Sequence, residues 1–102
     1  MALETTETYQ EDTLVIELNG RLDAMTSEGF QKLLLEKINE TKGDLILDCS
    51  GLEFVSSAGL RTFLTTQKAL SARGSQLRLV HAGDAIMKVL AMTGFDKFLK
   101  VE

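Results

Sequence analysis

Residues 45–60 read Leu45-Ile46-Leu47-Asp48-Cys49-Ser50-Gly51-Leu52-Glu53-Phe54-Val55-Ser56-Ser57-Ala58-Gly59-Leu60. Residues 45–49 form a nearly continuous apolar run, which is typical of a central strand that is covered on both faces of its sheet. Residues 50–55 predict a loop that still carries apolar side chains. The two serines that follow stand where a helix begins. The stretch therefore predicts a buried strand that leads through a short loop into a helix.

That helix is expected to span Ser57 to Arg73, with Gly74 as its C-cap. Its apolar stripe consists of Leu60, Phe63, Leu64 and Leu70, with Gln67 as an imperfection. Another strand is expected over residues 76–81. Together with the strand at residues 45–49, these elements predict one β-α-β crossover, and such crossovers are parallel and right-handed in nearly all proteins.

The N-terminal part predicts a hairpin and then a helix. Leu14, Ile16 and Leu18 alternate with Val15 and Glu17, which is the period-2 pattern of a strand with one better-buried face. A strand over residues 6–10 is expected to precede it, with a turn at residues 11–12 and Gly20 at the end of the hairpin. A helix is expected over residues 25–39, before Gly43. Its apolar stripe consists of Phe30, Leu33, Leu34 and Ile38, and it includes Lys37, whose stem is expected to pack while its ammonium reaches solvent.

The C-terminal part predicts one more helix, with Asp84 as its N-cap, Gly94 at its end and a short strand or turn at residues 98–101. Its buried stripe consists of Ile86, Val89 and Leu90. The predicted order is β-β-α-β-α-β-α within 102 residues, the size of one domain. We therefore expect an α/β fold over residues 1–102, a mixed sheet of four to five strands with helices packed on it.

Ser56 and Ser57 allow two interpretations. A serine at a helix start normally accepts a hydrogen bond from a free backbone N–H, which contributes about 1 kcal/mol. Capping requires one serine, however, and two stand here, followed by Ala58 and Gly59. Because glycine costs a helix up to about 1 kcal/mol relative to alanine, the small residues indicate a helix start that a partner or a phosphate can approach closely.

The same residues resemble the phosphorylation motif of the STAS domain family. The family's Asp-x-Ser, Phe-hydrophobic and Ser-Ser-Ala-Gly-Leu elements are matched by Asp48-Cys49-Ser50, Phe54-Val55 and Ser56-Ser57-Ala58-Gly59-Leu60. Its Gly-x-Leu-Asp is matched by Gly20-Arg21-Leu22-Asp23, and its stop after the last strong helix by Thr93-Gly94-Phe95. The resemblance spans residues 5–101, almost the whole chain.

This resemblance implies an anti-sigma factor antagonist that regulates transcription by partner switching, without being an enzyme. Such a protein, when unphosphorylated, binds an anti-sigma factor that is also a serine/threonine kinase. Phosphorylation of a serine at the helix start breaks the complex, and a serine phosphatase restores it. By position the acceptor is Ser57. The family often has aspartate just before the acceptor, whereas this chain has Ser56, whose hydroxyl is therefore the second choice. The implied contact surface consists of Asp23, Ser56, Ser57, Ala58, Gly59 and Leu60.

A phosphate at this position adds about −1.5 to −2 charge, and a helix N-terminus favours an anion by about 0.3–1 kcal/mol. The fold is therefore expected to survive the modification, whereas a closely packed or acidic interface is not. Asp23 is expected to lie nearby and to repel the phosphate. A turn or a helix N-cap is the alternative role for Asp23.

Composition restricts the partners and the compartment. Lys and Arg number 11 against 15 Asp and Glu, giving a net charge of −4, and this deficit argues against binding to nucleic acid or anionic lipid. Cys49 is the only cysteine, which fits a reducing compartment. Residues 1–7 lack the apolar core of a secretory signal, and no apolar run approaches the roughly 18 residues that span a bilayer. We expect a soluble cytoplasmic protein that is monomeric when free.

Two other classes of function remain open. The chain could be a STAS module of another signalling assembly or an accessory subunit of a lipid-transport complex. A hydrolase could use Ser57, His81 and Asp48 as a triad, but the nucleophile-elbow and nucleotide-binding glycine motifs are missing. One Cys and one His cannot make an ordinary zinc site, so neither a metal nor a cofactor is expected. Cys49 is expected to be a buried hydrophobe, and Met87, Leu90 and Met92 are expected in the core.

Overall fold

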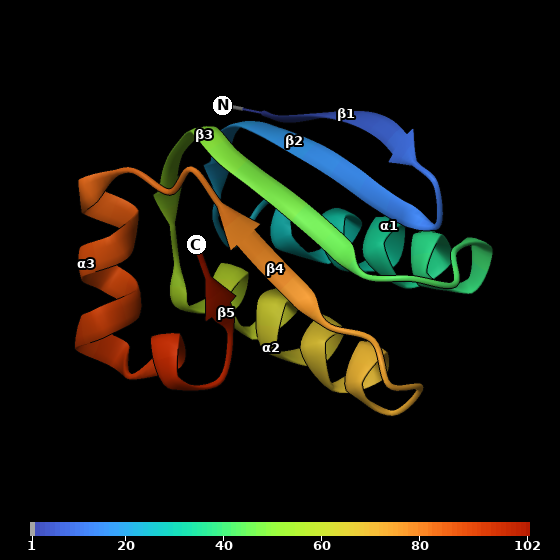
Figure 1. The fold of residues 1–102 in the computed structure, drawn as a ribbon. Helices are drawn as coiled ribbons and strands as arrows, with labels where there is room; N and C mark the ends of the chain where they lie inside the picture. Colours follow the sequence, from blue (N-terminus) through green and yellow to red (C-terminus); the bar gives the residue numbers. More distant parts are fainter. Residues whose placement is uncertain (1) are drawn as a thin grey trace.

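The computed structural model describes residues 2–102, which form a five-stranded sheet and three α-helices (Figure 1). The elements are β1 (Leu3–Gln10), β2 (Thr13–Leu22), α1 (Ser27–Glu40), β3 (Leu45–Val55), α2 (Ser57–Ser71), β4 (Leu77–Val80), α3 (Asp84–Thr93), the 3₁₀ helix η1 (Phe95–Lys97) and β5 (Lys100–Val101). The strands lie side by side in chain order. β1 pairs with β2 antiparallel, and every later pair is parallel. The predicted mixed α/β sheet and its element order are confirmed.

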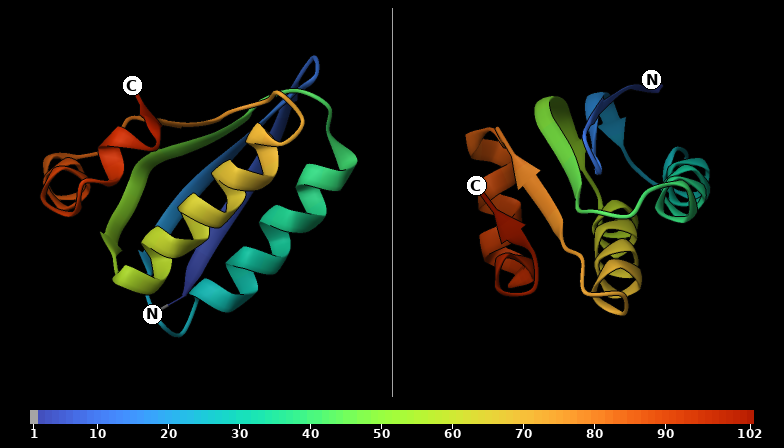
Figure 2. Two further views of the ribbon diagram at one scale, coloured as in Figure 1. Left: turned by 90° about the horizontal axis from the view of Figure 1, so that it is seen from below. Right: turned by 45° about the vertical axis from the view of Figure 1, so that its right-hand side comes forward.

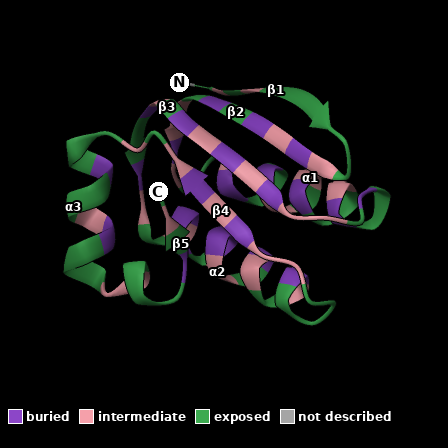
Figure 3. Ribbon diagram, viewed as in Figure 1, coloured by how far each residue is buried: buried purple, intermediate pink, exposed green. Residues whose placement is uncertain are grey.

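The two longest helices cover the same face of the sheet (Figure 2). Side chains alternate along the central strands, as the coloured bands in Figure 3 show. Toward the helices the strands bury Leu14, Ile16, Leu18, Leu45, Leu47, Cys49, Leu77 and Leu79. Val15, Ile46 and Val80, which point to the other face, are only half-buried. The expectation that residues 45–49 are covered on both faces is therefore wrong, because α1 and α2 pack on one side.

Strands β2 and β3 are both longer than predicted. Gly20 does not end β2, and residues 50–55 are part of β3 rather than a loop. Between Gly20 and Arg21 the register of the two strands shifts, after which Arg21 lies opposite Phe54. Gly20 adopts a φ of +117° at this irregularity, which glycine tolerates without a Cβ penalty. Because residues 51–55 also pair with β2, β3 continues to Val55, and α2 begins two residues later.

The helices pack through their predicted stripes. The rings of Phe30 in α1 and Phe63 in α2 meet edge to face, with centroids 6.5 Å apart. Gln67, an imperfection in the sequence pattern, has a structural role because its Oε1 accepts a hydrogen bond of 2.7 Å from the backbone N of Leu77. Lys37 is 19% exposed, and its Nζ reaches Glu7 Oε1 of β1 at 3.0 Å. The expected snorkelling lysine thus also ties α1 to β1.

The helix ends differ from the predictions by a few residues. α1 begins at Ser27 and α2 ends at Ser71, with Gly74 in a left-handed conformation just beyond it. Asp84 is the first residue of α3 and not its N-cap, which is Gly83. An acidic side chain in the first turn still interacts favourably with the helix dipole. Gly94 ends α3 at a φ of +79°, as expected.

Arg73 fastens the C-terminal end of α1 to the segment after α2. Its Nη1 donates to the carbonyl oxygens of Ile38, at 2.6 Å, and Thr41, at 2.8 Å. Its Nη2 donates to the carbonyl oxygen of Gly43 at 2.9 Å and to the hydroxyl of Thr41 at 3.2 Å. Carbonyls at a helix end have no partner within the helix, so the guanidinium satisfies groups that the fold leaves open.

Replacing Arg73 with alanine is expected to lower the free energy of unfolding by about 1–2 kcal/mol, because charged hydrogen bonds to the end of α1 are lost. Urea denaturation followed by circular dichroism measures the change. Lys68→Ala, which removes an exposed positive charge from the last turn of α2, is the control and is expected to stay within about 0.5 kcal/mol of wild type. Equal stability of the two variants would contradict the role of Arg73.

Candidate functional site

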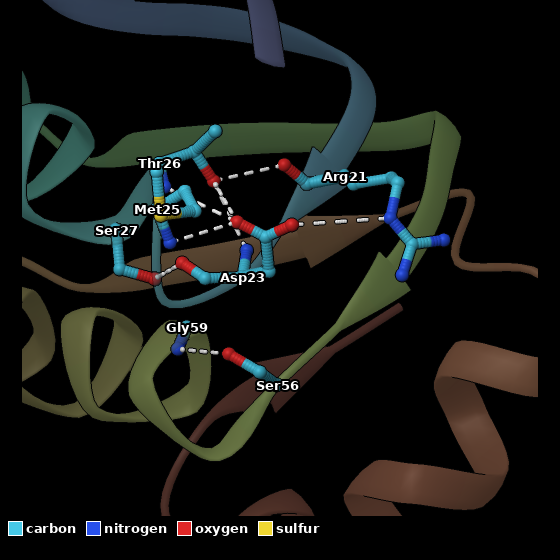
Figure 4. Close-up of polar contacts among 7 residues, drawn as sticks. All are labelled: Arg21, Asp23, Met25, Thr26, Ser27, Ser56 and Gly59. Atoms are coloured by element: carbon cyan, nitrogen blue, oxygen red, sulfur yellow. Dashed lines mark hydrogen bonds and ion pairs between the residues drawn. The ribbon is translucent and has the colours of Figure 1, made fainter. Parts of the chain in front are cut away.

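The segments that carry the two predicted motifs lie side by side at one end of the molecule. The backbone N of Ser56 donates to the carbonyl oxygen of Leu22 over 2.9 Å, which joins the end of β3 to the end of β2. The turn over residues 23–26 then leads into α1, while Ser56 leads into α2 (Figure 4). This hydrogen bond holds the starts of both helices together. Asp23, which follows Leu22, therefore lies near the serines, as expected.

The two serines have different roles. Ser56 is the N-cap of α2, in extended conformation, and its hydroxyl oxygen accepts a hydrogen bond of 3.2 Å from the backbone N of Gly59. Ser57 is the first residue of the helix and is exposed. Its hydroxyl makes no hydrogen bond with any group in residues 2–102. Since one serine meets the need for a cap, the other hydroxyl is available to react or to contact a partner.

The remaining residues of the motif form a gradient from surface to core. Ala58 is half-buried, and Gly59 and Leu60 are buried. A Cβ on Gly59 would lie 2.8 Å from the Leu22 side chain, 2.9 Å from its carbonyl oxygen and 2.9 Å from Val55. Glycine is therefore required here by packing, and its N–H is already bonded to Ser56. For Gly59, this steric reason replaces the expectation that a small residue serves the close approach of a partner or a phosphate.

Asp23 is built into the turn before α1. Its Oδ1 accepts hydrogen bonds from the backbone N of Met25 at 3.0 Å and of Thr26 at 3.2 Å. Its Oδ2 lies 3.9 Å from Nε of Arg21. Burial pushes the pKa of Asp23 upward, but the hydrogen bonds from Thr26 and Met25 outweigh it, so the pKa lies below its ordinary value of 3.8. A negative charge therefore stands at this end of the molecule at neutral pH.

Arg21, Phe54 and Met25 have exposed side chains near this turn and were not part of the contact surface expected from the sequence. Phe54 is 39% exposed and Met25 89% exposed. The guanidinium carbon of Arg21 lies 4.4 Å from the centroid of the Phe54 ring. The alternation of a strand supplies a signal for Phe54, because its neighbour Val55 points into the core and Phe54 must then point outward.

The groups of the imagined hydrolytic triad do not come together. Nδ1 of His81 lies 3.2 Å from Oδ1 of Asp48, on a ring that is 69% exposed. Burial raises the pKa of Asp48, yet hydrogen bonds from Ser50 and the contact with His81 bring that pKa below its ordinary value. Ser57 lies at the far end of β3 from this pair, beyond Val55. The geometry assembles no nucleophile with a base.

The remaining side chains named from the sequence divide between core and surface. Cys49 is fully buried, and burial raises the pKa of its thiol to about 12, so the thiol is unreactive. Leu90 is in the core as expected, but Met87 and Met92 are 42% and 76% exposed. The expectation that both methionines are buried is wrong, because α3 packs against β3 along one side only (Figure 1).

Within residues 2–102 no group of three or more His, Cys, Asp or Glu side chains is placed to hold a metal ion. No helix in the same part of the chain is both long enough and apolar enough to span a bilayer. An open groove of about 350 Å³ runs between the start of β1 and the start of α1. It is lined by Ala2, Leu3, Thr5, Met25, Thr26, Gly29, Phe30 and Leu33.

The STAS domain family matches residues 4–102, and the chain belongs to this family. Anti-sigma-B factor antagonists of Staphylococcus aureus are 24% identical over 101 residues, which are 99% of this chain and 94% of theirs. The crystal structure of an anti-sigma factor antagonist from Mycobacterium paratuberculosis has a TM-score of 0.87 at 22% identity, over 97% of this chain and 84% of that one. The Bacillus cell fate determinant SpoIIAA in its phosphorylated form gives 0.73 at 20% identity, over 98% and 90%.

Gly59→Ala is expected to lower the free energy of unfolding by about 1–3 kcal/mol, since the added methyl group clashes with Leu22 and Val55. Gly29→Ala in α1 is the matched control, because nothing lies within 4 Å of the Cβ it adds. The control is expected to stabilise the protein by up to about 1 kcal/mol through helix propensity. Thermal or urea unfolding measures both variants, and a stabilised Gly59→Ala would refute the steric reason.

The lowered pKa of Asp23 gives stability that depends on pH. A carboxylate whose pKa is depressed in the folded state stabilises the fold fully above its ordinary pKa, and the effect is lost as pH falls through the folded pKa. Asp23→Asn keeps an oxygen acceptor in the turn but cannot ionise. The difference in Tm between wild type and this variant is expected to be constant from pH 7 to about pH 5 and to shrink below about pH 4. An unchanged difference down to pH 2 would contradict the prediction.

Proposed function

We propose that this STAS domain protein is an anti-sigma factor antagonist whose binding is switched by phosphorylation of Ser57. In the unphosphorylated state it binds an anti-sigma factor with serine/threonine kinase activity and thereby frees the sigma factor. One observation carries the choice of residue. Ser56 supplies the cap of α2, so the exposed hydroxyl of Ser57 is left without a structural role.

The chemical step belongs to the kinase, and the antagonist supplies only the acceptor. The Oγ of Ser57 attacks the γ-phosphorus of ATP, the new O–P bond forms as the bond to the β-phosphate oxygen breaks, and ADP leaves. A base of the kinase takes the hydroxyl proton. A serine phosphatase reverses the state by hydrolysing the phosphate ester. The antagonist itself is not an enzyme in this scheme.

The position of Ser57 explains why phosphorylation would act on binding and not on folding. Its side chain leaves the first turn of α2 toward solvent, where the helix dipole tolerates an anion. Phosphorylation adds about −1.5 to −2 charge next to the segment that carries the ionised Asp23. An interface that closes over both groups must desolvate like charges. A penalty of about 2.7 kcal/mol already weakens binding a hundredfold.

The contact surface that we propose keeps the predicted residues but ranks them by exposure. Ser57 is exposed, Asp23, Ser56 and Ala58 are half-buried, and Gly59 and Leu60 are buried. The names of the Staphylococcus aureus relatives support the antagonist role. The phosphorylated form of SpoIIAA shows that a related fold carries such a modification. We place the protein in the cytoplasm, as a monomer when free, with no nucleic acid or membrane partner.

Pull-downs from an extract of the organism that encodes the protein test the proposal. The baits are wild type, Ser57→Ala, Ser57→Asp and the control Ser56→Ala, and bound proteins are identified by mass spectrometry. Wild type and Ser57→Ala are expected to recover an ATP-dependent kinase that Ser57→Asp loses by at least tenfold. Incubation of the recovered kinase with ATP should phosphorylate wild type and Ser56→Ala, but not Ser57→Ala.

Recovery of the same partners by all four baits would show that Ser57 is not a switch. The identity of those partners would then distinguish the other STAS assignments, such as another signalling assembly or a lipid-transport complex. Phosphorylation of Ser56→Ala would show that Ser56 is not the acceptor, since this variant lacks that hydroxyl and loses only the cap of α2.

A further inference from the structure

Arg21 and Phe54 form a stacked pair at the same end of the molecule as Ser57. They lie opposite each other on β2 and β3, and the guanidinium carbon is 4.4 Å from the ring centroid. Both side chains remain about 40% exposed, at 40% for Arg21 and 39% for Phe54. We call this pair the Arg21–Phe54 platform. The pair lies close along the chain to Ser57, because Phe54 is the residue before the last of β3 and stands two residues before the cap of α2.

Within residues 2–102 the side chain of Arg21 forms an ion pair with Asp23 but donates no hydrogen bond. The nearest acidic atom is Oδ2 of Asp23, which lies 3.9 Å from Nε and is too far for a hydrogen bond. In Figure 4 the two terminal nitrogens of Arg21 point away from Asp23. No side-chain hydrogen bond of Arg21 is found within residues 2–102. A guanidinium has five N–H donors, so a charged and planar donor edge faces outward.

The aromatic ring holds this edge in place before any partner arrives. A guanidinium that stacks on a ring gains cation–π attraction and keeps its plane fixed. A side chain that is already ordered loses less entropy when it binds. Arginine and aromatic residues are also enriched among the residues that dominate binding energy. The platform therefore has the composition and the rigidity of a binding site, and its charge is opposite to that of the chain as a whole.

We propose that the Arg21–Phe54 platform receives an aspartate or glutamate side chain of the kinase that binds this protein. The inference rests on the proposed function and specifies its partner surface. A carboxylate matches the fork of the guanidinium with two parallel N–H···O bonds. The protein's own Asp23 does not fill that place, because its Oδ2 comes no closer than 3.9 Å to Nε of Arg21 and its Oδ1 is engaged by the backbone N–H groups of Met25 and Thr26.

This assignment makes Arg21 a determinant of partner choice that acts separately from the phosphorylation switch. Ser57 decides whether the complex forms, and Arg21 decides which kinase fits, because an acidic residue at position 21 would repel the same carboxylate. A basic contact also attracts an acidic partner during encounter, so part of the effect should depend on ionic strength.

The test uses the kinase recovered with the wild-type bait, purified and titrated against variants of the full chain by isothermal titration calorimetry. Arg21→Glu is expected to weaken binding about a hundredfold and Arg21→Lys several-fold, since lysine keeps the charge but not the planar fork. Lys42→Glu is the matched control. It makes the same charge change at an exposed residue between α1 and β3, at the other end of β3 from Ser57, and is expected to stay within twofold of wild type.

A charge exchange then identifies the carboxylate. Surface Asp and Glu residues of the kinase are changed to Lys one at a time, and one of them is expected to restore binding to Arg21→Glu while weakening binding to wild type. Thermal unfolding confirms that the Arg21 variants are folded. Equal affinity of Arg21→Glu and Lys42→Glu, with the Ser57→Asp effect intact, would overturn the platform alone. Failure of wild type to bind any kinase would overturn the proposed function and this inference with it.

Discussion

The hydrogen bond from the backbone N of Ser56 to the carbonyl oxygen of Leu22, at 2.9 Å, sets the geometry of the whole site. It fixes the point where β2 and β3 end and where their chains turn into α1 and α2. Gly59 packs against the same residue with no room for a Cβ. Because the two helices begin from one clamped junction, the Asp23 turn and the Ser57 hydroxyl have a fixed relation to each other. The site is thus built from the same contacts that close the fold.

Local patterns in the sequence were enough to predict the order of the elements, because each apolar stripe reports on its own helix or strand. They failed where pairing between distant segments decides the structure. Residues 50–55 carry serine and glycine signals for a loop, yet their pairing with residues 19–22 keeps them in β3. Gly20 was expected to end a hairpin and instead accommodates a shift of register. Which face of β3 is covered could not be predicted either, since it depends on where the helices pack.

The candidate site was located by its motif, but the roles within it required coordinates. Two adjacent serines are equivalent in a sequence, and only the backbone conformation shows that Ser56 is the cap. The Arg21–Phe54 platform depends on the register between β2 and β3, which periodicity does not reveal. Met87 and Met92 have the hydrophobicity of core residues, and their exposure follows from the single side on which α3 packs.

The separation of the cap at Ser56 from the proposed acceptor at Ser57 has a consequence for how such a protein can evolve. Because the side chain of Ser56 caps α2, the side chain at position 57 is not needed as the cap of the helix. Under the proposed function, threonine, glutamate or alanine at this position would give a retuned, a constitutively released or a constitutively bound protein with little change in stability. In that case a single codon could change the regulation while the fold stays the same.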